Sequence, residues 1–165
     1  MALTAPPPVQ LLTIEGGPAW SPFRIRALLA RLGRAVPRVA AVSARHVHWA
    51  AFDGVPTPET VRRLRALLDR GAPAPANADG ELIVVMPRLG TVSPWASKAT
   101  DIAHNCAIGA APGAPRLLRI ERVTEYRIAL ARGWRGAPKL AAAERDALAA
   151  LLHDRMTESV AFAAD

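Results

Sequence analysis

The chain has 165 residues, of which 51% are hydrophobic and only 5% aromatic, and its 21 basic and 14 acidic residues give a formal net charge of +7. This is a globular composition, sufficient for one domain or for two small half-domains that share a core. Cys106 is the only cysteine and no apolar run approaches the ~18 residues of a membrane span, which excludes an internal disulfide, a cysteine-rich zinc site and a membrane partner. We expect a soluble, cytoplasmic protein.

The basic excess is almost entirely arginine, since Lys98 and Lys139 are the only lysines. Guanidinium groups bind phosphates well, so one interpretation is a nucleic-acid surface. The arginines are scattered, however, and no RNP-like, helix-turn-helix or finger motif accompanies them. We therefore favour a general compositional bias and keep a free-standing basic nucleic-acid-binding domain as the alternative.

Residues 1–8 are predicted to form a disordered arm, and residues 9–70 a first structural half. Its elements are expected at 9–14 (strand), 21–33 (helix), 39–44 and 45–52 (strand segments) and 58–70 (helix). Gly16-Gly17-Pro18 should break the first strand, and the first helix should begin after Ser21 and end at Gly33. No Asn-Gly or Asp-Gly marks a turn near residues 43–45, so a hairpin and one long bent strand both remain possible.

Residues 71–80 have the composition of a linker, and residues 81–155 repeat the same order as a second half. Its elements are expected at 81–86 (strand), 93–106 (helix), 118–120 and 126–130 (strand segments, with residues 122–124 either a turn or a bend) and 140–153 (helix). Residues 159–163 could add a final strand, and we expect 156–165 to begin a linker to further domains. Two copies of β-α-β-β-α predict an α+β fold of two tandem ferredoxin-like units, with antiparallel sheets and helices packed on one face.

The stretch 90–106, GTVSPWASKATDIAHNC, is the most specific in the chain. Ser93 before Pro94 has the pattern of a helix start, and Ala99, Ile102, Ala103 and Cys106 follow at helical spacing as a face that would pack on the sheet. Lys98, Asp101 and Asn105 share another face that we expect to make contacts. On this interpretation Cys106 is a packing residue rather than a nucleophile.

Other candidate sites are weaker. There is no G-x-x-x-x-G-K-[ST], G-x-G-x-x-G or G-x-S-x-G motif, so we predict no catalytic, cofactor-binding or metal-binding residue in the chain. His46 and His48 could bind zinc with a third ligand, although a half-exposed strand face is the commoner explanation. Asp101 and His104 could share a metal or hydrogen-bond each other, and we favour the hydrogen bond. The cluster Asp154, Arg155, Thr157 and Glu158 is either a charged helix end or an interface.

Residues 90–106, preceded by Leu82-Ile83-Val84-Val85-Met86-Pro87-Arg88, resemble the N-terminal region of the large, single-chain form of phosphoribosylformylglycinamidine synthase. Further similar segments are 17–21, 119–122 and 152–158, so the resemblance covers about residues 9–160. Val123 departs from the glycine that the family tends to have after Ile-Glu-Arg.

The resemblance implies a ligase with glutamine amidotransferase activity, which uses glutamine and ATP to convert formylglycinamide ribonucleotide into formylglycinamidine ribonucleotide in the fourth step of purine biosynthesis. It also implies a PurS-like N-terminal domain, a fused pair of the small accessory subunit, that docks the synthetase and glutaminase domains of the same enzyme and helps to channel ammonia. ATP, Mg²⁺ and the catalytic residues would then belong to other domains, and this stretch alone would be inactive, with possible self-association through its bare docking surface. The contact candidates are Ser93, Trp95, Ser97, Lys98, Thr100, Asp101, His104, Asn105, Asp154, Arg155, Thr157 and Glu158.

Overall fold

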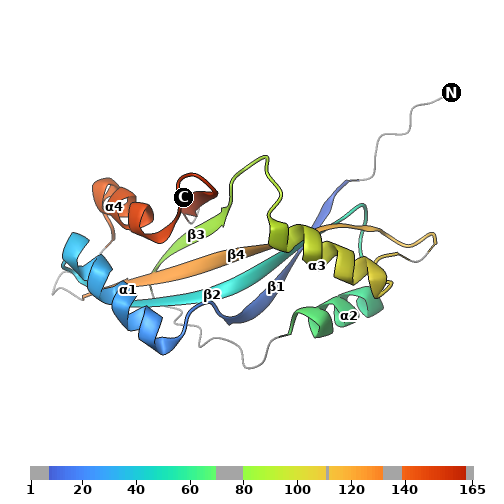
Figure 1. The fold of residues 1–165 in the computed structure, drawn as a ribbon, viewed down its shortest axis with the longest axis horizontal. Helices are drawn as coiled ribbons and strands as arrows, with labels where there is room; N and C mark the ends of the chain where they lie inside the picture. Colours follow the sequence, from blue (N-terminus) through green and yellow to red (C-terminus); the bar gives the residue numbers. More distant parts are fainter. Residues whose placement is uncertain (1–7, 70–79, 111, 132–138, 163–165) are drawn as a thin grey trace.

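A computed structural model of the chain describes residues 8–69, 80–110, 112–131 and 139–162. Within these residues four helices alternate with five strands (Figure 1). They are β1 (Gln10–Pro18), α1 (Pro22–Ala35), β2 (Val39–Phe52), α2 (Pro58–Leu68), β3 (Glu81–Pro87), α3 (Pro94–Asn105), β4 (Leu117–Leu130), α4 (Ala142–Leu152) and β5 (Glu158–Phe162). No described helix is both long and apolar enough to cross a membrane.

The strands form one antiparallel sheet in the order β1-β2-β4-β3-β5. Its centre is the pair of 14-residue strands β2 and β4, which run side by side from Val39 opposite Leu130 to Phe52 opposite Leu117. Each therefore replaces the two strand segments expected in its half, which settles the choice between a hairpin and one long strand. The α+β prediction is confirmed, and the repeated order β-α-β-α is consistent with two ferredoxin-like units. The expected last strand is β5.

Three helices begin with a hydroxyl residue followed by proline, as the sequence predicted for two of them, at Ser21 and Ser93. The hydroxyl oxygens of Ser21, Thr57 and Ser93 accept hydrogen bonds from the backbone N–H three residues later, at 3.4, 3.2 and 3.0 Å. α4 starts differently, because at its first turn the carboxylate of Glu144 accepts from the backbone N–H of Ala141 at 2.8 Å. The local sequence thus determines the residue at which each of these helices begins.

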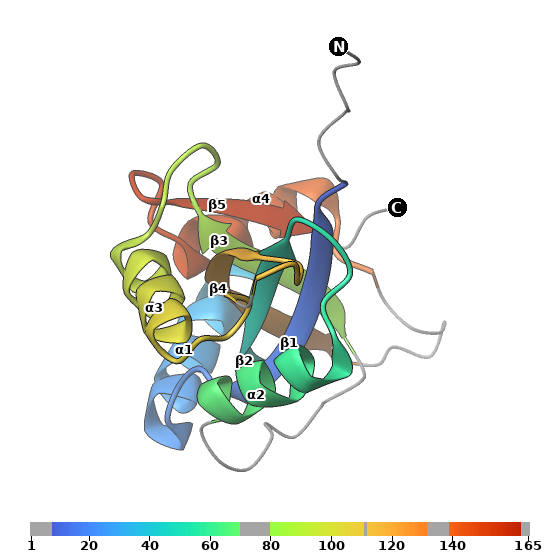
Figure 2. The same cartoon turned by 90° about the vertical axis from the view of Figure 1, so that its right-hand side faces the viewer.

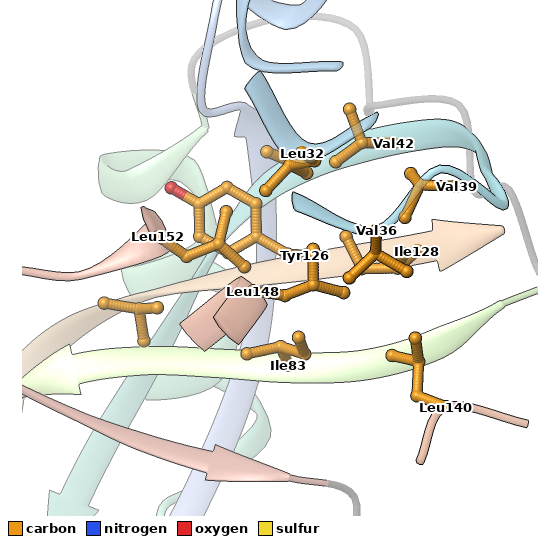
Figure 3. Packing of buried hydrophobic residues seen from close by; sticks show 12 residues of the cluster. Leu32, Val36, Val39, Val42, Ile83, Tyr126, Ile128, Leu140, Leu148 and Leu152 are labelled. Atoms are coloured by element: carbon orange, nitrogen blue, oxygen red, sulfur yellow. The ribbon is translucent and has the colours of Figure 1, made fainter. Parts of the chain in front are cut away.

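All four helices pack on one face of the sheet, over two apolar clusters. The first cluster joins α1 and α4 to β2, β3 and β4 and includes Leu32, Ile83, Tyr126 and Leu148, whose side chains converge in Figure 3. The second lies under α2 and α3 and includes Phe52, Leu64, Ala103 and Ile120. Figure 2 shows α1, α2 and α3 on the same side of the strands.

An ion pair also ties the two halves together. The Nε of Arg38, between α1 and β2, donates to the carboxylate of Glu144 in α4 at 2.8 Å. The hydrogen bond from Arg38, followed by that from the backbone of Ala141, lowers the pKa of the Glu144 carboxyl from 4.5 to about 2.

Two predicted boundaries are wrong. Gly33 lies inside α1, which continues to Ala35; Val36 then leaves the helix in an extended conformation because it precedes Pro37. Gly16-Gly17-Pro18 belong to β1 instead of breaking it, and the register with β2 shifts between Glu15 and Pro18. Glycine at position 16 permits this close approach, since a Cβ there would lie 2.8 Å from the backbone oxygen of His46.

The predicted packing face of α3 is confirmed for Ala99 and Ala103 and wrong for Ile102 and Cys106. The residues buried against the sheet are Ala96, Thr100 and Ala103, whereas Ile102 is 42% exposed and Cys106 is exposed. The helix turns its smallest side chains toward the sheet because they allow the closest approach of the helix to the strands. The hydroxyl of Thr100 is accommodated there because it accepts a hydrogen bond from the backbone N–H of Ile120. The predicted disordered arm (1–8) and linker (71–80) lie outside the described residues, apart from Pro8 and Gly80.

Candidate functional site

α3 lies against a free edge of β4. β3 pairs with β4 only between Thr124 and Ile128, so the backbone of β4 before Thr124 needs other partners on that side. The hydroxyl of Thr100 accepts from the buried N–H of Ile120 at 2.9 Å, and Nε2 of His104 donates to the carbonyl of Leu117 at 2.8 Å. These two polar residues of the stretch 90–106, which we call the motif, therefore attach the helix to the sheet. His104 uses this contact rather than the predicted pairing with Asp101.

The start of α3 is fixed by Ser93 and Trp95. Besides capping the helix, Ser93 donates its hydroxyl proton to the Glu121 carboxylate at 2.8 Å. The Trp95 ring stacks on the buried His48 ring with centroids 5.4 Å apart, and the Arg122 guanidinium lies 4.8 Å from the centre of the Trp95 ring. The sequence had not linked these residues, because they meet only when β2, β4 and α3 are assembled.

The remaining polar residues of α3 face outward. Lys98, Asp101 and Asn105 are exposed, and Ser97 is exposed with its hydroxyl 3.4 Å from the Ser93 carbonyl. We call Lys98, Asp101 and Asn105 the outer face of α3. Thus the motif divides into residues that anchor the helix and residues that the anchored helix presents.

The second candidate cluster, 154–158, forms a tight turn between α4 and β5. The Asp154 carboxylate accepts from the N–H of Met156, and the Glu158 carboxylate accepts from the N–H of Asp154, both at 2.8 Å. Arg155 and Thr157 are exposed. The backbone carbonyl of Thr157 accepts from the N–H of Arg88 at 2.9 Å, so this turn lies directly beside the loop 88–93 that leads into α3. The structure thereby brings together two segments distant in sequence.

The histidines of β2 do not form a metal site with other described residues. His46 lies near Thr124, with Nδ1 to Oγ1 at 3.5 Å, while His48 stacks on Trp95. In the described part of the chain no group of three or more His, Cys, Asp or Glu side chains is placed to hold a metal ion.

Sequence reasoning missed a hollow on the sheet face opposite the helices. We call it the open-face trough; it has a volume of about 230 Å³ and is lined by Leu11, Trp49, Ala51, Met86, Leu89 and Val123, among others. At one side lies the ion pair of Arg119 with Glu121, and Arg119 also donates to the carbonyl of Thr91 at 2.9 Å. The signal that could have indicated it is the continuous apolar run of β3, which has apolar side chains on both faces.

One comparison with known proteins bears on these surfaces. The family model described as formylglycinamide ribonucleotide amidotransferase N-terminal matches residues 45–165, which is more than half of the chain. The matched region contains α3, the loop 88–93 and the turn 154–158.

Proposed function

The chain belongs to the formylglycinamide ribonucleotide amidotransferase N-terminal family, and on this premise we propose that it is the docking part of that purine-biosynthesis enzyme. It would hold the synthetase and glutaminase parts against each other and help to keep ammonia from escaping between them. The outer face of α3 would contact these parts directly.

The observation that carries this proposal is the way α3 is attached. Four polar or aromatic side chains of the motif, Ser93, Trp95, Thr100 and His104, are engaged in contacts within the domain. Anchoring of this kind holds the backbone of the helix in place, so that its exposed side chains project from fixed positions, which a docking surface requires. Lys98, Asp101 and Asn105 supply one cation, one anion and one amide on that rigid helix, a set suited to a polar protein surface.

The turn 154–158 supports the same assignment. Its hydrogen bond from Arg88 to Thr157 places it next to the loop 88–93, so Arg155 and Thr157 extend the surface beyond α3. A partner that contacts the loop can reach both segments.

We place the chemistry of the enzyme in its other parts. The sequence contains no phosphate-binding loop and one cysteine, Cys106, which lies exposed at the end of α3. We therefore propose that ATP and Mg²⁺ bind elsewhere in the amidotransferase and that the present domain is inactive alone.

The arrangement of charges supports the nucleic-acid alternative less than it supports the docking role. Arg38, Arg45, Arg119 and Arg145 are each ion-paired with a carboxylate, which reduces their availability for phosphates. A gel shift that weakens steeply from about 50 to 200 mM salt would favour that alternative.

The test uses the full-length amidotransferase that carries this domain, with Lys98→Ala and Asp101→Ala. We expect the glutamine-dependent rate to fall while the ammonia-dependent rate is retained, because coupling between the two active sites is lost and the synthetase site is intact. Arg26→Ala, on the exposed side of α1, is the matched control and should change neither rate. Unchanged rates with both substrates in the double variant would refute the docking role of this face.

A further inference from the structure

The open face of the sheet is more apolar than a solvent-exposed face requires. β3 alternates Ile83 and Val85, which pack under the helices, with Leu82, Val84 and Met86, which point to the other side. A short apolar run of this kind is typical of a strand that is buried on both sides. Yet the cluster on this other side, centred on Val47, Val84 and Val123, contains no residue from any of the four helices.

The trough on this face has the size of a side-chain pocket. Its volume of about 230 Å³ is below the roughly 300–1,000 Å³ of sites for small-molecule ligands. Trp49, Met86 and Val123 form its apolar wall, and Leu11 and Leu89 at its rim are 62% and 77% exposed. A buried apolar or aromatic anchor from another protein surface fits this arrangement.

Several charges of the open face are paired with each other within the domain. Arg45 pairs with Glu15 at 2.9 Å and with Glu125 at 2.8 Å, and Arg119 pairs with Glu121. Arg88, which also lines the trough, is not one of these paired residues, so the trough combines an apolar wall with one cation at its edge. Its complement is an apolar side chain on a surface without excess positive charge.

We propose that the open-face trough is a second docking surface, on which the catalytic part of the amidotransferase seats an apolar side chain. This inference rests on the proposed function. The trough and the outer face of α3 are continuous. The loop 88–91 forms one wall of the trough, donates a hydrogen bond from Arg88 to the carbonyl of Thr157, and leads into α3. One partner can therefore cover the trough and the outer face of α3 together.

The first test is hydroxyl-radical footprinting, which measures the solvent accessibility of individual side chains. It compares the 165-residue chain with the full-length amidotransferase that carries it. We expect Trp49, Met86 and Leu89 to be oxidised severalfold more slowly in the full-length enzyme, while Phe23 on α1, 72% exposed, is unchanged. Protection of α3 without protection of the trough would overturn this inference and leave the proposed function standing. No protection of either surface would overturn both.

The second test changes exposed rim residues, which should not affect folding. Leu11→Asp and Leu89→Asp each place a carboxylate at the rim of the trough, where a docked apolar side chain would remove it from water, and each is expected to lower the glutamine-dependent rate of the full-length enzyme about tenfold. Phe23→Asp is the matched control at an equally exposed apolar residue and should have no effect. Sedimentation of the 165-residue chain provides a further outcome: if it dimerises and Leu11→Asp abolishes dimerisation without changing the enzyme's rates, a second copy occupies the trough and the inference is wrong.

Discussion

Thr100 offers the sharpest test of how α3 is held. Its hydroxyl is buried and accepts from the N–H of Ile120 at 2.9 Å. Replacing Thr100 with Val keeps the shape and removes the acceptor, so a buried N–H is left without its partner. Such a group costs about 1–3 kcal/mol, and a loss of this size in a domain of this length lowers Tm by about 2–4 °C per kcal/mol.

Two companion variants separate the hydrogen bond from packing. Thr100→Ser keeps the hydroxyl and loses one methyl group, which should cost about 0.8 kcal/mol, and Thr100→Ala should lose approximately the sum of both effects. The measurement is urea unfolding followed by circular dichroism, with the free energy extrapolated to water and the slope compared between variants. If Thr100→Val is as stable as the parent chain while Thr100→Ser is destabilised, the hydrogen bond is not what anchors the helix.

Three further predictions concern the scaffold. Because the pKa of Glu144 is lowered in the folded state, its contribution to stability is complete above pH 4.5 and is lost as the pH falls toward about 2. Glu144→Gln should therefore flatten that part of the acid-unfolding profile. An unchanged profile would contradict the role of Arg38. Gly33→Ala should raise stability by about 0.5–1 kcal/mol, since the added methyl meets no atom within 4 Å inside α1. Gly16→Ala should instead lower Tm in thermal unfolding, because its Cβ would lie 2.8 Å from the oxygen of His46.

Local signals in the sequence predicted the helices better than the strands. A serine followed by proline, at Ser21 and at Ser93, specifies a helix start through a contact only three residues away. Such starts can therefore be recognised without knowledge of the fold. The length of β2 and β4 could not be settled in this way, because their continuity depends on pairing with each other across the chain.

The candidate surface was predicted in composition but not in arrangement. The motif at 90–106 indicated a specified helix, yet Thr100 was counted among the contact candidates although its hydroxyl binds the edge of β4. Spacing alone does not distinguish an exposed hydroxyl from one that satisfies a neighbouring strand, since that strand is identified only by the sheet order. The trough was missed for a similar reason: the continuous apolar run of β3 indicates two apolar faces but not which one the helices leave uncovered.

The central pairing of β2 with β4 has a consequence for how the chain folds. Val47 lies opposite Val123, so the middle of the sheet forms only when residues from both halves are present. During synthesis, β2 is complete long before β4 emerges from the ribosome. The edge of β2 that pairs with β4 therefore stays unpaired until then. Closing so long a loop is slow, and it makes β2–β4 docking the expected rate-limiting event of folding. We therefore expect the repeated halves to fold together as one cooperative unit, and a chain divided between α2 and β3 to yield two aggregation-prone pieces instead of two small domains.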